Sequence, residues 1–110
     1  MLINKEDNVV TFTRESSSFL EFVKKFFVEY PSYRQYNMVI NLFSLEQLSV
    51  DNLLEFLEIS EKHRNDKKSF VLVTDVLNID ELPEELVVAP TLQEAMDIIE
   101  MEEIERDLDF

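Results

Sequence analysis

The chain has 110 residues, 45% of them hydrophobic, and its 24 acidic and 10 basic side chains give a formal net charge of −14. This length suits one domain, which we place at residues 1–110, and the negative field opposes binding to a nucleic-acid backbone. Glycine and cysteine are absent and histidine occurs once, which excludes glycine-built phosphate loops, disulfides, thiolate zinc sites and clustered-histidine metal centres.

The apolar runs of the chain are short. The longest include Phe70–Val73 and residues 86–89, far fewer than the roughly 20 residues that cross a bilayer. The segment after Met1 also lacks the basic and then apolar pattern of a secretion signal. We therefore expect a cytoplasmic protein that does not enter a membrane.

The first third of the chain predicts a hairpin and a helix. Apolar groups at 2–3 and 9–12 are separated by the polar residues 6–8, a pattern typical of two strands and a turn. Serines at 16–18 then offer N-cap candidates, and the helix should end before Pro31. The apolar side chains spaced to line one helical face are Phe19, Phe22, Val23, Phe26 and Tyr30.

The middle of the chain predicts a buried strand and a second helix. Residues 38–42 are mostly apolar, as in a strand covered on both faces. Ser49 is placed to cap one continuous helix, whose basic end would complement the helix dipole. The apolar face of this helix comprises Leu53, Leu54, Phe56, Leu57 and Ile59, and its basic end comprises His63, Arg64, Lys67 and Lys68.

The last third predicts two strands and a closing helix. Phe70–Val73 is typical of a parallel strand inside a sheet, and residues 86–89 predict a shorter strand. Between them, residues 79–85 favour a helical turn or loop. Thr91 and Glu94 have capping-box spacing, and the helical stripe that follows consists of Leu92, Ala95, Met96 and Ile99.

These elements follow the order strand, strand, helix, strand, helix, strand, strand, helix. Such alternation predicts an α/β fold with a mixed, mainly parallel sheet of about five strands and three to four helices. From Met38 onward the pattern resembles the STAS family of sulphate transporters and anti-sigma-factor antagonists, and residues 91–95, Thr-Leu-Gln-Glu-Ala, look like the family's T-x-x-E-A ending. The resemblance implies a STAS-like fold and a non-enzymatic, regulatory protein-interaction module of the bacterial cytoplasm, without a cofactor.

In antagonists of that family the second helix opens with D-S-S/T-G, whose hydroxyl is phosphorylated. Laid against this motif, Asp51 takes the phosphorylated position and Asn52 takes the position of the glycine, so the hydroxyl is missing. One hypothesis is that the Asp51 carboxylate mimics the phosphorylated state. The alternative is structural: Ser49 caps the helix and Asp51 only complements its positive end.

The resemblance implies docking on a partner protein of unknown identity through the start of the second helix. Leu20 and Phe27 lie off the core-facing stripe of the first helix, so if they are exposed we expect a docking patch or a homodimer contact. The predicted partner-binding residues are Ser44, Gln47, Ser49, Asp51, Asn52, Leu20 and Phe27. The alternative function is a small-ligand-binding domain that uses the loops at 43–49 and 75–79.

Three further constellations predict no site. The acids of the C-terminal tail suggest a solvated helix face rather than a metal site, because consecutive helical residues point in different directions. Ser60 and His63 are three residues apart, but nothing orients the imidazole, so we expect a histidine in solvent at the helix end and no catalytic residue. Asp75 and Asp80 follow the strand at 70–73, and we expect them to form turns.

Overall fold

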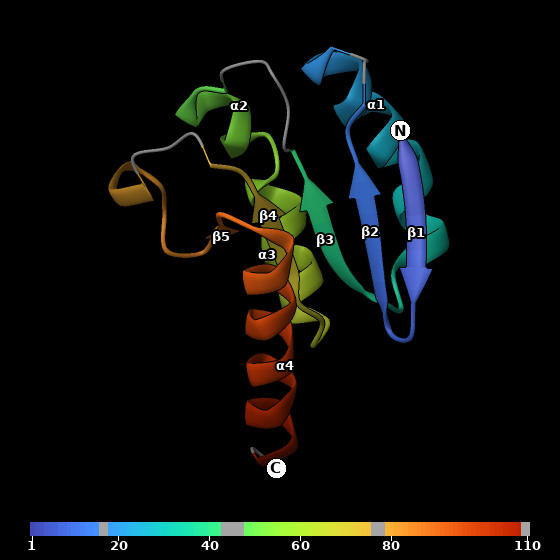
Figure 1. The fold of residues 1–110 in the computed structure, drawn as a ribbon, viewed down its shortest axis with the longest axis vertical. Coiled ribbons are helices and arrows are strands. Elements are labelled where there is room, and N and C mark those ends of the chain that lie inside the picture. The colour runs from blue at the N-terminus through green and yellow to red at the C-terminus, as the bar shows by residue number, and fades with distance from the viewer. Residues whose placement is uncertain (16–17, 43–47, 76–78, 109–110) are drawn as a thin grey trace.

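The computed structural model describes residues 1–15, 18–42, 48–75 and 79–108. Five strands form one sheet in which spatial order follows chain order (Figure 1). The first two strands are antiparallel and the later neighbours are parallel, which confirms the expected mixed, mainly parallel α/β fold. The strands are β1 (Leu2–Glu6), β2 (Val9–Thr13), β3 (Asn37–Asn41), β4 (Phe70–Val73) and β5 (Val87–Ala89).

Two positions need the left-handed backbone region that glycine normally supplies. Asp7, in the hairpin turn, has φ of 54°, and Lys67, in the turn that precedes β4, has φ of 67°. Aspartate tolerates this region because its short side chain bonds locally, whereas lysine has no such compensation. The chain therefore makes its tight turns without glycine, at some conformational cost at Lys67.

Helix α1 (Phe19–Glu29) follows the expected pattern. Ser18 caps it by accepting a hydrogen bond from the Glu21 amide at 3.2 Å. The chain then tightens into a 3₁₀ turn, Tyr30–Tyr33, that contains Pro31. The prediction that the helix ends before this proline is confirmed.

The predicted second helix is divided in two, so the prediction of one continuous helix is wrong. Helix α2 (Val50–Leu54) and helix α3 (Leu57–Asn65) are separated by Glu55 and Phe56. Phe56, with φ of −95° and ψ of −3°, departs from the ideal helical angles of about −63° and −42°. Its fully buried ring lies edge-on to the rings of Phe19 and Phe26. The break lets this ring enter the core while α3 follows the sheet.

Helices cover both faces of the sheet (Figure 1). Helices α1 and α3 pack on one face over the larger core, which contains Phe12, Phe26 and Phe70. Helix α4 (Leu92–Leu108) lies on the other face, where it packs mainly on β3, β4 and β5. The smaller core beneath it consists of Val9, Val39, Val71, Val73, Ala89, Ala95 and Ile99.

His63 lies inside the larger core, which corrects the expectation of a solvent-exposed histidine. Its Nε2 lies 2.8 Å from the backbone oxygen of Tyr36, and its Nδ1 lies 2.9 Å from the hydroxyl of Tyr30. A carbonyl can only accept, so Nε2 carries the proton and Nδ1 accepts from Tyr30. Burial lowers the pKa of His63, which favours the neutral ring. Ser60 bonds elsewhere, to the Glu85 carbonyl at 3.5 Å, so the two residues form no catalytic pair.

Tyr30→Phe removes the hydroxyl that donates to His63 and leaves a buried nitrogen without its partner. We expect a loss of about 1 to 3 kcal/mol in the free energy of unfolding, measured by urea denaturation. Tyr36→Phe is the matched control, because its hydroxyl bonds exposed side chains, among them Lys5 at 3.0 Å, and no buried one. Tyr36→Phe should lower the free energy of unfolding by less than about 0.5 kcal/mol. Equal losses in the two variants would contradict the proposed role of the buried bond.

Candidate functional site

The start of α2 is built by a reciprocal capping box. The Ser49 hydroxyl accepts from the Asn52 amide at 3.2 Å, and the Asn52 side-chain oxygen accepts from the Ser49 amide at 2.9 Å. The Ser49 hydroxyl also donates to that Asn52 oxygen, at 3.0 Å. Ser49 is therefore the expected cap, and Asn52, at the glycine position of the antagonist motif, is the other half of the box.

Asp51 takes no part in this box. It is exposed in the first turn of α2 and makes no hydrogen bond or ion pair with any residue that the structure describes. The capping box satisfies the amides of Ser49 and Asn52 without a contribution from Asp51. The carboxylate is therefore free to interact with a molecule outside the chain.

Apolar side chains lie near α2. Leu54 is 36% exposed and Leu20, in the first turn of α1, is 63% exposed. The ring of Phe19 lies 6.0 Å from that of Phe56, which brings the first turn of α1 beside the α2–α3 break. Phe27 is 42% exposed but lies two helical turns from Leu20. The predicted residues Ser44 and Gln47 lie outside the described residues.

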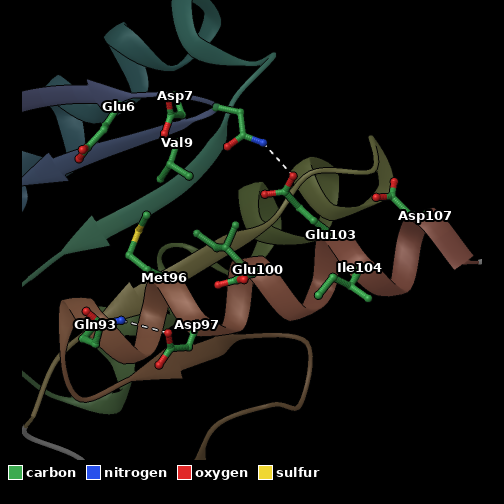
Figure 2. Close-up of a pocket in the computed structure, with 12 residues that line it drawn as sticks. Glu6, Asp7, Val9, Gln93, Met96, Asp97, Glu100, Glu103, Ile104 and Asp107 are labelled. Atoms are coloured by element: carbon green, nitrogen blue, oxygen red, sulfur yellow. Dashed lines mark hydrogen bonds between the residues drawn. The ribbon is translucent and has the colours of Figure 1, made fainter.

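A second feature is an acidic groove of about 500 Å³ between the β1–β2 turn and α4 (Figure 2). Its apolar side chains include Val9 and Met96, which face one another across the groove. Neither lysine nor arginine lines it. The carboxylates around it belong to Glu6, Asp7, Asp97, Glu100, Glu103 and Asp107.

These carboxylates are spread along the groove. Within the described parts of the chain, no three histidine, aspartate or glutamate side chains are grouped closely enough to hold a metal ion. Asp97 accepts from Gln93 at 3.0 Å, and Glu103 accepts from Asn8 at 2.8 Å (Figure 2). The groove therefore presents negative charge over a surface, which attracts cationic groups and repels acidic ones.

The C-terminal half of α4 is held to the domain by a polar network, so the expectation of a wholly solvated acidic face is wrong for Glu102 and Glu103. Glu102 accepts two bonds from the Arg64 guanidinium, at 2.9 and 3.3 Å, and one from the buried Ser69 hydroxyl at 2.6 Å. Asn37 donates to Glu103 at 3.2 Å. Arg64, which we expected only to complement a helix dipole, thus links α3 to α4.

Glu102→Ala should loosen α4, because it leaves the partly buried Arg64 and the buried Ser69 hydroxyl without their shared acceptor. We expect a loss of about 1 to 3 kcal/mol in the free energy of unfolding, measured by urea denaturation. Glu105→Ala, an exposed position on the same helix, is the matched control and should change it by less than about 0.5 kcal/mol. An equally small effect at Glu102 would show that the network contributes little.

The remaining sequence expectations concern loops and termini. Asp75 and Asp80 are both exposed, as turn-forming acids would be. Thr91 accepts from the Glu94 amide at 3.1 Å, which confirms the predicted cap of α4. Ile104 and Leu108, four residues apart on α4, are 52% and 75% exposed and form a short apolar strip. In the described ranges, no helix has the length and apolar character needed to cross a membrane.

The architecture is similar to that of a solved STAS-domain protein, RsbS of Moorella thermoacetica, determined as a variant with glutamate in place of a serine. The two structures superpose with a TM-score of 0.58 at 19% sequence identity, over 90% of this chain and 96% of RsbS. The fold is STAS-like. No protein-family model matches the chain, and neither does any curated protein. At this identity the likeness to RsbS establishes the fold alone.

Proposed function

We propose that this STAS-like chain is a non-enzymatic regulatory module of the cytoplasm that docks on a partner protein through the start of α2. The observation that carries the proposal is the free carboxylate of Asp51 on the same short helix as the partly exposed Leu54, on a STAS-like fold. Protein-binding surfaces commonly combine exposed apolar side chains with a polar rim. The predicted docking residues Ser49, Asp51, Asn52 and Leu20 belong to this end of the molecule.

The position of α2 supports this proposal. Helix α2 lies beyond the carboxyl end of β3 (Figure 1), and open sheets with parallel strands commonly bind their ligands at that end. Leu20 is not required to fill the core, because it is 63% exposed, and Leu54 stays 36% exposed while Phe56 and Leu53 are fully buried. A partner protein that covers them would remove this apolar surface from water.

Asp51 gives the surface a fixed negative charge. Because the capping box supplies the stabilising bonds of the helix start, removal of Asp51 should cost little stability. We infer that its charge acts on the partner, in the way that a phosphate on a hydroxyl would act. A carboxylate, unlike a hydroxyl that is phosphorylated, carries its charge at all times. Docking would therefore be constitutive and not controlled by phosphorylation.

Affinity capture from an extract of the source cells tests the docking site. Wild-type chain, Asp51→Lys and Leu54→Glu are immobilised at equal density, and bound proteins are quantified by mass spectrometry. We expect one stoichiometric protein whose recovery falls at least about tenfold with either variant. Leu108→Glu, an exposed apolar position on α4, is the control and should retain it. Equal recovery on all four chains would contradict docking at α2.

The charge hypothesis has its own test on the captured partner. Asp51→Ser and Asp51→Ala both remove the carboxylate, and each should weaken the measured affinity by a similar factor, roughly threefold to tenfold. Phosphorylation of the new serine should restore it. If both variants bind as tightly as wild type, Asp51 only complements the helix end and the charge hypothesis is wrong.

The alternative function, small-ligand binding by the loops at 43–49 and 75–79, stays a prediction, because residues 43–47 and 76–78 lie outside the described part of the chain. The capture experiment separates the two functions. A small molecule that co-purifies with the chain, in the absence of a stoichiometric protein, would favour ligand binding.

A further inference from the structure

Strand β1, at one edge of the sheet, has an outer side with no neighbouring strand among the described residues. Strand β1 pairs only with β2 and is the first strand of the sheet. Beside it, between β1 and α1, lies a groove of about 400 Å³ that is mostly apolar. The residues that line this groove are Met1, Ile3, Lys24, Lys25, Val28 and Glu29. An open edge strand next to an apolar groove is a surface on which another strand and helix can pack.

The adjoining face of α1 is also apolar. Leu20, Lys24 and Val28 recur at intervals of four residues and therefore lie in one line along the helix. Leu20 is 63% exposed and Val28 is 75% exposed, and Phe27, next to this line, is 42% exposed. Leu20 and Val28 are therefore not needed to fill the core of the single chain. Lys24 and Val28 also line the edge groove, and we name this groove, together with the adjoining line of α1, the α1–β1 edge.

Charge distinguishes the α1–β1 edge from the other exposed apolar surface of the molecule. Helix α1 carries Glu21 and Glu29 against Lys24 and Lys25, so its charges cancel. Helix α4, where Ile104 and Leu108 are exposed, carries seven acidic side chains and only Arg106 as a base. A second copy of a chain with net charge −14 is repelled at α4 and is least repelled at a neutral surface.

Lysine on an edge strand often prevents pairing with another strand. Here the Lys5 ammonium bonds the Tyr36 hydroxyl at 3.0 Å and lies 5.0 Å from the centre of the Tyr36 ring. The Lys5 side chain therefore lies over its own sheet, where Tyr36 of the same chain binds it. The backbone N–H and C=O groups on the outer side of β1 therefore stay accessible to another strand.

We propose that the α1–β1 edge binds a second copy of this chain, by antiparallel pairing of β1 with β1 about a two-fold axis at Asn4. The five-residue strand then pairs over its full length, with Leu2 opposite Glu6 and Ile3 opposite Lys5 of the second copy. No like charges stand directly opposite one another. The two copies of α1 pack side by side across the axis, which covers Val28 in both.

One exposed valine and one exposed leucine give a matched test of the proposed dimer. Val28 and Leu108 are each 75% exposed on a helix, so glutamate at either position adds the same charge at little cost to folding. By analytical ultracentrifugation over a concentration series we expect a dimer of the wild-type chain. Val28→Glu should raise its dissociation constant by at least about tenfold, whereas Leu108→Glu should leave it within about twofold. A wild-type monomer at every concentration, or equal effects of the two variants, would overturn the proposal.

The absence of cysteine allows a second test that reports position directly. Asn4→Cys places one thiol near the proposed axis in each copy, so mild oxidation should yield a disulfide-linked dimer on a denaturing gel. Asp97→Cys, an exposed position beside the acidic groove on α4, should give little of it. Equal cross-linking at both positions, or none at Asn4→Cys, would show that β1 strands do not meet.

This inference can be tested separately from the proposed docking at α2, because the two surfaces share only Leu20 and none of the variants changes that residue. Asp51→Lys should leave the dimer unchanged, and Val28→Glu should leave capture of the partner protein unchanged. Failure of the dimer would therefore leave the docking proposal standing, and the converse also holds.

Discussion

Two strands in the middle of the sheet, β3 and β4, must be shielded from water on both faces. The side chains from Met38 to Ile40 and from Phe70 to Val73 are almost completely buried, so each face of these strands needs its own layer of helices. Helices α1 and α3 provide one layer, and α4 provides the other (Figure 1). Because α4 is held by Glu102 to Arg64 and Ser69, its position is set by polar contacts as well as by apolar packing.

This double covering determines which surface is left for other molecules. Helix α4 packs mainly on β3, β4 and β5, so it does not cover the outer strand β1, whose Leu2 stays 57% exposed. Among the described strands β1 pairs with β2 alone, so its other edge is open. Helix α2 lies at the carboxyl end of the sheet and buries Leu53 while leaving Asp51 and Leu54 outside. Charge then distinguishes three surfaces: the neutral edge proposed for a second copy, the α2 end proposed for docking, where the Asp51 carboxylate is free, and the acidic face of α4.

The sequence predicts most of the fold because apolar periodicity reports directly on burial. The β1–β2 hairpin, the two buried strands and the caps at Ser49 and Thr91 all follow from local patterns. The division between α2 and α3 does not, because it depends on where the Phe56 ring fits among distant rings. A continuous apolar pattern is compatible with either one helix or two.

The candidate site was less predictable. The spacing of apolar residues does not show how wide the buried face of a helix is. The sequence therefore does not decide whether Leu20 and Phe27 are exposed. The sequence predicts His63 in solvent because it lies at a helix end and no nearby residue orients its imidazole, whereas its two hydrogen-bond partners, Tyr30 and Tyr36, lie about thirty residues away. The bonds from Glu102 and Glu103 to distant elements were missed for the same reason: no local signal marks a contact between side chains far apart in sequence.

The central claim is that burial and charge make the α1–β1 edge suitable for binding a second copy and leave α2 accessible to a partner protein. Hydrogen exchange by mass spectrometry, on the purified chain at low and high concentration, tests this claim most directly. We expect amides of β1 and α1 to exchange more slowly at high concentration, while those of α2 and α4 exchange at the same rate. Slower exchange in α2 or α4, or no change in any segment, would contradict the claim.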